Sequence, residues 1–401
     1  MDPATLALAA LIWHGSTEIA AGPGVRGPWQ QNESRYDFVD DPTVEIDASG
    51  GFLLAWVDQG HKDVYFQRMD ASGKRTTEAV NVSRSPKVLS WLPRVATDNK
   101  GHIFVLWQEI IFSGGSHGGD MLFARSTDGG KTFSEPLNLS RSLAGDGKGR
   151  IDKDRWHNGS FDLVVGPDGV IHTAWTEYEG ALWVRRSNDG GKTFSEKIRI
   201  ADSKPARGPS LAADADTVYL AWTVGDDASA DVRVAKSVVG KFGAPLIVGK
   251  SKPYSDAPKL ALDARGTLHL AYADGKRILY SRSADGARSF ERPREIWARN
   301  AGFPSLDLDA KGNVYVLFER FEEHPFLARG LGIAISTDGG DTFKTGAVPG
   351  SVGEGWNGSS QGLLMRKLAV GDHGAIAIVN SSFKENERSR VWLVRGRLEP
   401  Q

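Results

Sequence analysis

The chain has 401 residues, with 49 Lys and Arg against 50 Asp and Glu, 47 glycines and no cysteine. The formal net charge of −1 argues against a nucleic-acid partner or a polybasic membrane anchor, and we expect neither. The lack of cysteine excludes disulfides, thiolate metal sites and a cysteine nucleophile. No segment approaches the roughly 20 consecutive apolar residues of a membrane span, so we expect no membrane association.

At the N-terminus, residues Thr5 to Trp13 are apolar, but Asp2 precedes them where a secretory signal would carry basic residues. We expect a mature N-terminus there rather than a clear signal peptide.

Further along the chain, one unit recurs: a strand, a tight turn and a second strand that ends near an aromatic residue. In five copies a proline precedes the aromatic by 13 or 14 residues: Pro42/Trp56, Pro93/Trp107, Pro209/Trp222, Pro258/Tyr272 and Pro304/Phe318. The segments Phe161 to Trp175 and Lys367 to Val379 repeat the unit without that proline, which makes seven copies.

A second motif, Ser-x-Asp-x-Gly-x-x-aromatic, follows the strand pairs. Four good copies occupy residues 126–133, 187–194, 283–290 and 336–343, and degenerate copies lie at 69–76 and 237–242. Repeats of about 50 residues predict a solenoid, a propeller or an array. Together the two motifs predict a single all-β domain over residues 1–401, a seven-bladed propeller of four-stranded antiparallel blades, with six blades as the alternative. The last blade lacks a fourth strand, and we expect Ile12 to Ala20 to supply it beside residues 390–397.

The Ser-x-Asp turns resemble the Asp-box, or bacterial neuraminidase repeat, of the sialidase superfamily. The resemblance implies a bacterial, secreted or periplasmic, carbohydrate-active protein. It also places these turns between third and fourth strands, on the face away from the active site. Asp128, Asp189, Asp285 and Asp338 are then structural, because Asp readily accepts hydrogen bonds from turn amides. Sialidases open their first blade with an Arg-Ile-Pro motif that grips a carboxylate, whereas here the first repeat has Asp40-Asp41-Pro42 and only Arg207-Gly-Pro209 keeps the Arg-x-Pro form.

Function is therefore sought on the opposite, top face, which carries the loops after each second strand and before each first strand. Second strands end in carboxyl groups, which we expect to ring the mouth of the channel or, alternatively, to hold neighbouring loops by hydrogen bonds. They are Asp58, Glu109, Glu177, Asp274 and Glu319.

From these residues we select Glu177 and Glu109 as candidate acid/base groups, Tyr178 as a nucleophile or acid, and His157 as an alternative base. Arginines can bind a carboxylate and aromatic rings can stack on sugars. The candidate substrate-binding residues are Arg94, Arg155, Arg207, Trp156, His117 and Tyr254.

The sequence thus favours a glycoside hydrolase or polysaccharide lyase that takes a glycan or other small ligand in a central top-face pocket, with no cofactor. Two alternatives stay open. The first is a non-catalytic propeller that binds a glycan or a protein partner, and the second is a propeller that binds a metal through top-face histidines.

Overall fold

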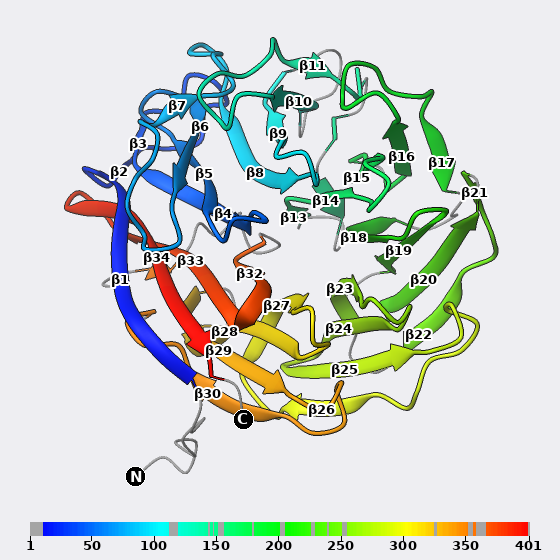
Figure 1. Cartoon of the computed structure of the whole chain (residues 1–401). Coiled ribbons are helices and arrows are strands. Elements are labelled where there is room, and N and C mark those ends of the chain that lie inside the picture. The colour runs from blue at the N-terminus through cyan, green and yellow to red at the C-terminus, as the bar shows by residue number, and fades with distance from the viewer. Residues whose placement is uncertain are drawn as a thin grey trace.

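The protein is described by a computed structural model that covers residues 11–111, 119–142, 145–146, 148–150, 156–178, 180–200, 205–225, 229–238, 240–250, 255–324, 327–351, 356–357 and 366–399. Seven antiparallel blades surround a central axis, so the predicted seven-bladed propeller is confirmed (Figure 1). Among the described residues a 3₁₀ turn at Asp372–Gly374 is the one helical element, and no helix is long and apolar enough to cross a membrane.

Each blade runs from an innermost first strand to an outer strand, which is short in blades 1 to 6. Blade 1 consists of β4 (Val39–Ile46), β5 (Phe52–Asp58), β6 (Asp63–Met69) and β7 (Val80–Asn81). Blade 2 consists of β8 (Ser90–Thr97), β9 (Ile103–Glu109), β10 (Asp120–Ser126) and β11 (Leu137–Asn138). Blade 3 consists of β14 (Phe161–Val165), β15 (Ile171–Thr176), β16 (Leu182–Ser187) and β17 (Ile198–Ile200). Blade 4 consists of β18 (Ala206–Ala213), β19 (Thr217–Val224), β20 (Asp231–Val238) and β22 (Leu246–Lys250), and β21 (Lys241–Phe242) also pairs with β20. Blade 5 consists of β23 (Ser255–Leu262), β24 (Leu268–Asp274), β25 (Arg277–Ser283) and β26 (Arg294–Trp297). Blade 6 consists of β27 (Ala301–Leu308), β28 (Val314–His324), β29 (Leu327–Ser336) and β30 (Lys344–Ala347). Blade 7 consists of β32 (Leu368–Val370), β33 (Ala375–Lys384), β34 (Arg388–Leu398) and β1 (Leu11–Gly22).

The ring is closed by the N-terminal strand, as the sequence predicted. β1 pairs with β34 in antiparallel register from Leu11 opposite Leu398 to Gly22 opposite Ser389. In Figure 1 the two ends of the colour scale therefore lie side by side in one blade. This pairing covers the edge that β34 would otherwise expose.

The recurring proline marks a bulge in the first strand. In blade 1 the register with β5 shifts between Asp40 and Thr43, and Asp41, which precedes Pro42, has φ of 50°. The other four proline-containing first strands shift in the same place, and the residue before each proline has a positive φ; these residues are Leu92, Gly208, Ala257 and Phe303. A proline cannot donate to the ladder, so a bulge is where an inner strand can hold one.

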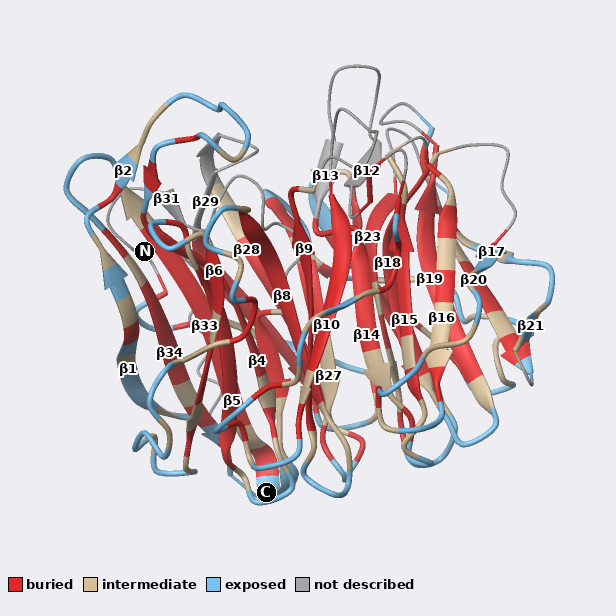
Figure 2. Ribbon diagram, turned by 90° about the horizontal axis from the view of Figure 1, so that it is seen from above, coloured by how far each residue is buried: buried red, intermediate tan, exposed pale blue. Residues whose placement is uncertain are grey.

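The hydrophobic core lies between neighbouring blades. The aromatic residue of each second strand is buried there, with Trp107, Trp175 and Trp222 fully so. Figure 2 shows the inner strands almost continuously buried and the exposed positions gathered in turns and outer strands. Stacked blades therefore bury what one blade would leave exposed.

The Ser-x-Asp segments, called here the Ser-Asp turns, join third and fourth strands as predicted. In residues 187–194, Ser187 Oγ donates to Asp189 Oδ1 at 2.8 Å, and the amides of Lys192 and Thr193 donate to the same oxygen at 3.0 Å. The other three copies repeat this pattern. They share a face with the hairpins between first and second strands, called here the turn face, which lies opposite the top face (Figure 2).

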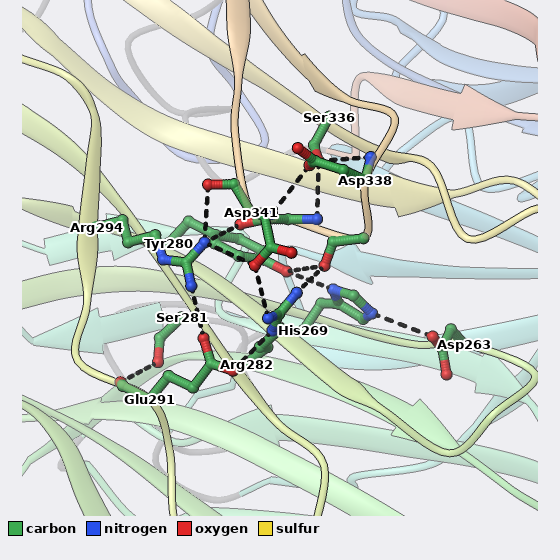
Figure 3. A network of polar contacts seen from close by, with 12 residues as sticks. Asp263, His269, Tyr280, Ser281, Arg282, Glu291, Arg294, Ser336, Asp338 and Asp341 are labelled. Carbon is green, nitrogen blue, oxygen red and sulfur yellow. Dashed lines mark hydrogen bonds and ion pairs between the residues drawn. The ribbon is translucent and has the colours of Figure 1, made fainter.

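The aromatic residue of a Ser-Asp turn packs on the third strand of the preceding blade. Phe194 meets Phe123 with ring centroids 5.0 Å apart, and Phe343 meets Tyr280 at 4.9 Å. Figure 3 shows the polar contacts that join blade 5 to the turn of blade 6. Tyr280 Oη lies 2.6 Å from His269 Nδ1, and Arg282 donates to the Gly339 carbonyl at 2.6 Å. The Ser-Asp turns therefore join blades.

Candidate functional site

Two predicted clamps, Arg94 and Arg207, are completely buried in the first-strand bulges. Arg94 donates to the carbonyls of Leu92 and Gly159 and lies over the Phe161 ring at 4.9 Å. Burial lowers the pKa of Arg94 to about 10. Arg207 Nε lies 3.1 Å from Asp256 Oδ2, and these two residues occupy the same position, two before the proline, in adjacent blades. Both guanidinium groups connect neighbouring blades, and neither has exposed surface.

The carboxyl groups at the ends of the second strands do not ring the channel, because the first strand is the innermost one. The described cavity on the axis is lined by first strands and by Arg366. Asp58 instead accepts from His61 at 2.9 Å, Asp274 pairs with Arg277, and Glu319 pairs with buried Lys367. The interpretation as hydrogen-bond positions fits these three residues.

Glu109 is also held by hydrogen bonds. Its Oε1 accepts from Trp107 Nε1 at 3.0 Å and from Ser85 Oγ at 2.7 Å, and the side chain is buried. Burial raises the pKa of Glu109. Ser85 belongs to Asn81-Val-Ser83-Arg84-Ser85, whose backbone and side chains also surround Asp63 at the start of β6. Glu109 thus joins blade 2 to the last loop of blade 1.

Glu177 occupies the equivalent position in blade 3 but has different partners. Trp175, like Trp107, precedes its glutamate by two residues, yet Trp175 Nε1 is buried and has no hydrogen-bond partner among the described residues. Glu177 Oε1 lies 3.7 Å from Lys197 Nζ, and Lys197 also lies 4.4 Å from the centre of the Trp183 ring. Glu177 therefore occupies the same repeat position as Glu109 but accepts no hydrogen bond from the tryptophan two residues before it.

The segment Gly145–Asp146 lies beside Glu177 and contacts its backbone. The Asp146 amide donates to Gly119 O at 2.6 Å, and the Tyr178 amide donates to Gly145 O at 2.7 Å. Asp146 also forms backbone bridges to Gly119 and Glu177. The segment thus joins the top-face loops of blades 2 and 3, and it fixes the backbone of Glu177 and Tyr178 beside Asp146.

Asp146 is a fully buried carboxyl group. Neither of its oxygens has a hydrogen bond of ordinary geometry with a described residue. Burial raises the pKa of Asp146 to about 8, weak hydrogen bonding by the Ser140 and Ser142 hydroxyl groups lowers it in part, and the Glu177 charge raises it further. Gln108 Nε2 donates to the Asp146 carbonyl at 2.5 Å, while Gln108 Oε1 is buried without a described partner. Several buried polar atoms at this junction are thus unpaired within the described structure.

Asp146 was not selected from the sequence, although one signal pointed to it. It lies between two glycines, in Gly145-Asp146-Gly, within the longest top-face connection, between Arg141 and His157. Glycine-flanked acids in long loops are common, so this signal becomes specific only when the fold places Asp146 next to Glu177.

The remaining candidates are described in part or not at all. His157 and Trp156 lie in β13 (Trp156–Asn158), which pairs with β12 (Lys148–Arg150), and their side chains are outside the described set. Arg155, His117 and Tyr254 fall outside the described residues. Within the described part of the chain, no three His, Asp or Glu residues are grouped as metal ligands.

A cavity of about 270 Å³ lies on the axis, in the half nearer the turn face rather than at the top face. Arg366 lies 2.9 Å from Asp162 and 3.7 Å from Glu45. Burial raises the pKa of Glu45 to about 7 and lowers that of Lys259 to about 7. The Leu211 amide donates to Asp162. Asp162 thus holds adjacent first strands together and pairs with Arg366.

The chain matches no protein-family sequence model and no curated protein sequence. Many solved structures resemble it, including the following three. An ulvan lyase, a polysaccharide lyase bound to -[GlcA(1-4)Rha3S]-, aligns with a TM-score of 0.55 and 13% identity over 88% of this chain and 93% of its own. A protein of unknown function from Dyadobacter fermentans has a TM-score of 0.54 and 13% identity over 79% and 97% of the two chains. YCF48 bound to D1 peptide has 0.50 and 12% identity over 97% and 96%. At these identities the likeness is one of fold.

Proposed function

We propose that this protein is a carbohydrate-active enzyme, a glycoside hydrolase or a polysaccharide lyase, with Asp146 and Glu177 as its acid and base. The observation that carries the proposal is the buried Asp146 carboxyl, which has no hydrogen bond of ordinary geometry with a described residue and is fixed beside the Glu177 backbone. Glycosidases use two carboxyl groups whose surroundings give them different protonation states. The ulvan lyase of the same fold, bound to a uronate-containing oligosaccharide, supports a glycan as the ligand class.

The two groups differ in the way this chemistry requires. Asp146 has a pKa near 8, so it carries a proton at neutral pH and can donate it to a leaving oxygen. Glu177 is partly exposed and faces Lys197. It can accept a proton or activate Tyr178, which follows it in the chain. The pair favours hydrolysis, whereas a lyase would depend on His157 or Tyr178 as the base.

A polysaccharide and sialoside panel, read for reducing ends and for the ultraviolet absorbance of unsaturated products, tests the activity. On an identified substrate, Asp146→Asn and Glu177→Gln should each lower kcat by about 10²–10⁴. His157→Ala separates the mechanisms, because its loss should be small in a hydrolase and large in a lyase. Glu45→Gln is the matched control, since it removes a carboxyl of raised pKa from the axial cavity. Its activity should stay at the wild-type level.

Two results would overturn the proposal. Full activity of both Asp146→Asn and Glu177→Gln would remove blade 3 as the catalytic blade. If no glycan is turned over while a glycan or protein still binds the top face, the protein is a binding propeller.

A further inference from the structure

The junction between blades 3 and 4 differs from its neighbours on the turn face. At three other junctions the Ser-Asp turn inserts a ring against an aromatic residue of the preceding third strand: Phe133 on Phe66, Phe194 on Phe123 and Phe343 on Tyr280. Between blades 4 and 5, Phe290 packs into the cluster that contains Val234 and Tyr219. A phenyl ring of the Ser-Asp turn thus packs against the preceding blade at these four junctions.

Blade 4 has a shortened turn. Its degenerate motif runs from Ser237 to Phe242, two residues shorter than the motif from Ser187 to Phe194, and it lacks the aspartate. The position held by Phe123 in blade 2 is Val184 in blade 3, as the pairing of the second and third strands shows. Phe242 of this turn packs against the cluster that contains Val184 and Val218. The smaller third-strand residue and the shorter turn nevertheless leave a cavity of about 160 Å³ beside these three residues.

One polar group at this cavity has also lost its usual partner. In blades 2 and 5 the third-strand arginine donates to the next Ser-Asp turn: Arg125 to Gly190 O at 3.3 Å and Arg282 to Gly339 O at 2.6 Å. Arg186 occupies the same position in blade 3 and lines the cavity beside Gly240. Its backbone amide donates to Ser195 Oγ, but its guanidinium group makes no hydrogen bond or ion pair with a described residue. The site therefore offers an apolar slot with a free cation at its rim.

We propose that this cavity binds a small aromatic carboxylate, with the ring in the space that Val184 and the shortened turn leave beside Phe242, and the carboxylate on Arg186. The volume matches the ring, because an apolar cavity of about 150 Å³ in another protein binds benzene. His172 lines the slot as a neutral ring, since burial lowers its pKa to about 4. Asp168 and Asp216 also line the cavity. Asp168 Oδ1 accepts from the Val170 amide at 3.1 Å, so this carboxylate already has a partner.

The test is titration calorimetry of the full chain with phenylacetate, followed by diffraction from crystals soaked in 4-bromophenylacetate. We expect one site, with bromine density between blades 3 and 4. Val184→Phe restores the ring found in blade 2 and should abolish binding. Arg186→Gln should weaken binding by roughly 10-fold, the loss of one charge-assisted contact. Arg125→Gln is the matched control at a filled slot and should leave the affinity unchanged.

The proposal fails if phenylacetate does not bind at millimolar concentrations, or if Val184→Phe binds it as the wild type does. Tighter binding of benzylamine than of phenylacetate would assign the rim to Asp168 and Asp216 rather than Arg186, and would also overturn it. The result is independent of the glycan proposal, because it is measured without turnover and at residues on the other face.

Discussion

At the scale of single residues, the aspartates of the Ser-Asp turns show how a polar side chain stabilises a turn. Asp338 accepts from Ser336 Oγ and from the amides of Asp341 and Thr342. Desolvation by itself would raise the pKa of the Asp338 carboxyl, but these hydrogen bonds together outweigh it and lower the pKa to about 2. Asp338→Ala should lower the free energy of unfolding by about 1 kcal/mol, because the turn is exposed and water replaces part of the loss.

The depressed pKa of Asp338 also fixes the pH range of this effect. A carboxyl group whose pKa is lower in the folded state than in the unfolded state stabilises the folded protein above pH 4. This stabilisation is lost as the pH falls towards 2. Thermal melts of wild type and Asp338→Ala should therefore differ at pH 7 and converge near pH 2. A variant that melts like the wild type at pH 7 but binds its ligand more weakly would give Asp338 a functional role instead.

Asp146 should produce the opposite dependence. Its folded pKa of about 8 exceeds the ordinary value of 3.8, so its stabilising effect is complete below pH 4 and is lost as the pH rises to 8. Asp146→Asn should therefore gain stability relative to the wild type as the pH increases from 4 to 8. Melting temperatures across that range measure the difference. Parallel curves for the two proteins would show that Asp146 ionises normally.

At the scale of elements, the fifth residue of the Ser-Asp turn is set by the preceding blade. Gly191 has φ of 80°, and a Cβ there would lie 2.7 Å from the Phe123 ring. In blade 5 the same position is Ala287, with φ of 63°, and the third-strand residue before it is the smaller Val234. The chain thus permits a methyl group only where the neighbouring blade leaves room.

Gly191→Ala should cost about 1–3 kcal/mol, since it adds both a clash with the ring and backbone strain. Ala287→Gly, the matched change in blade 5, should alter stability by less than about 1 kcal/mol because lost packing and relieved strain oppose each other. Urea denaturation measures both. Equal effects for the two variants would contradict a blade-specific role of the aromatic ring.

At the scale of the whole molecule, closure depends on β1. The strand makes the outer edge of blade 7 and joins residues near both ends of the chain. Arg388 pairs with Glu18 at 2.5 Å across this seam, and Arg75 of blade 1 donates to the carbonyl of Ile19 at 3.1 Å. The last blade is therefore held by a segment that folds in from the beginning of the sequence.

Deleting residues 1–22 should lower the melting temperature and increase amide exchange in β34 before the other blades are affected. Deleting residues 1–10 is the control, because β1 begins at Leu11. If exchange in β34 is unchanged after the longer deletion, the seam does not hold the last blade.

Most of the fold could be predicted because each blade repeats local signals. The proline register indicated the first and second strands of a blade, and Asp189 with Gly191 indicated a turn between third and fourth strands. The missing fourth strand after β34 indicated closure by residues near Ile12. These signals depend on neighbours within about ten residues, and seven copies make a chance match improbable.

The candidate site was much less predictable. Glu109 and Glu177 share one repeat position, yet Glu109 accepts from Trp107 and Ser85 while Glu177 faces Lys197. Arg207 has the Arg-x-Pro form of a carboxylate clamp but lies buried against Asp256. Whether a polar side chain is paired or unpaired depends on residues that are tens of positions away in the chain. The repeat pattern does not say which of those residues will lie next to it.

The sequence by itself therefore determined the blades, their number, the closing strand and the structural role of the Ser-Asp turns, because short-range hydrogen bonds and alternating apolar positions specify them. The tertiary structure alone decided that Asp146 is buried beside Glu177 and that a cavity lies between blades 3 and 4. Burial and pairing arise when separate loops and blades pack together, and they set the pKa of Asp146 and the free guanidinium of Arg186.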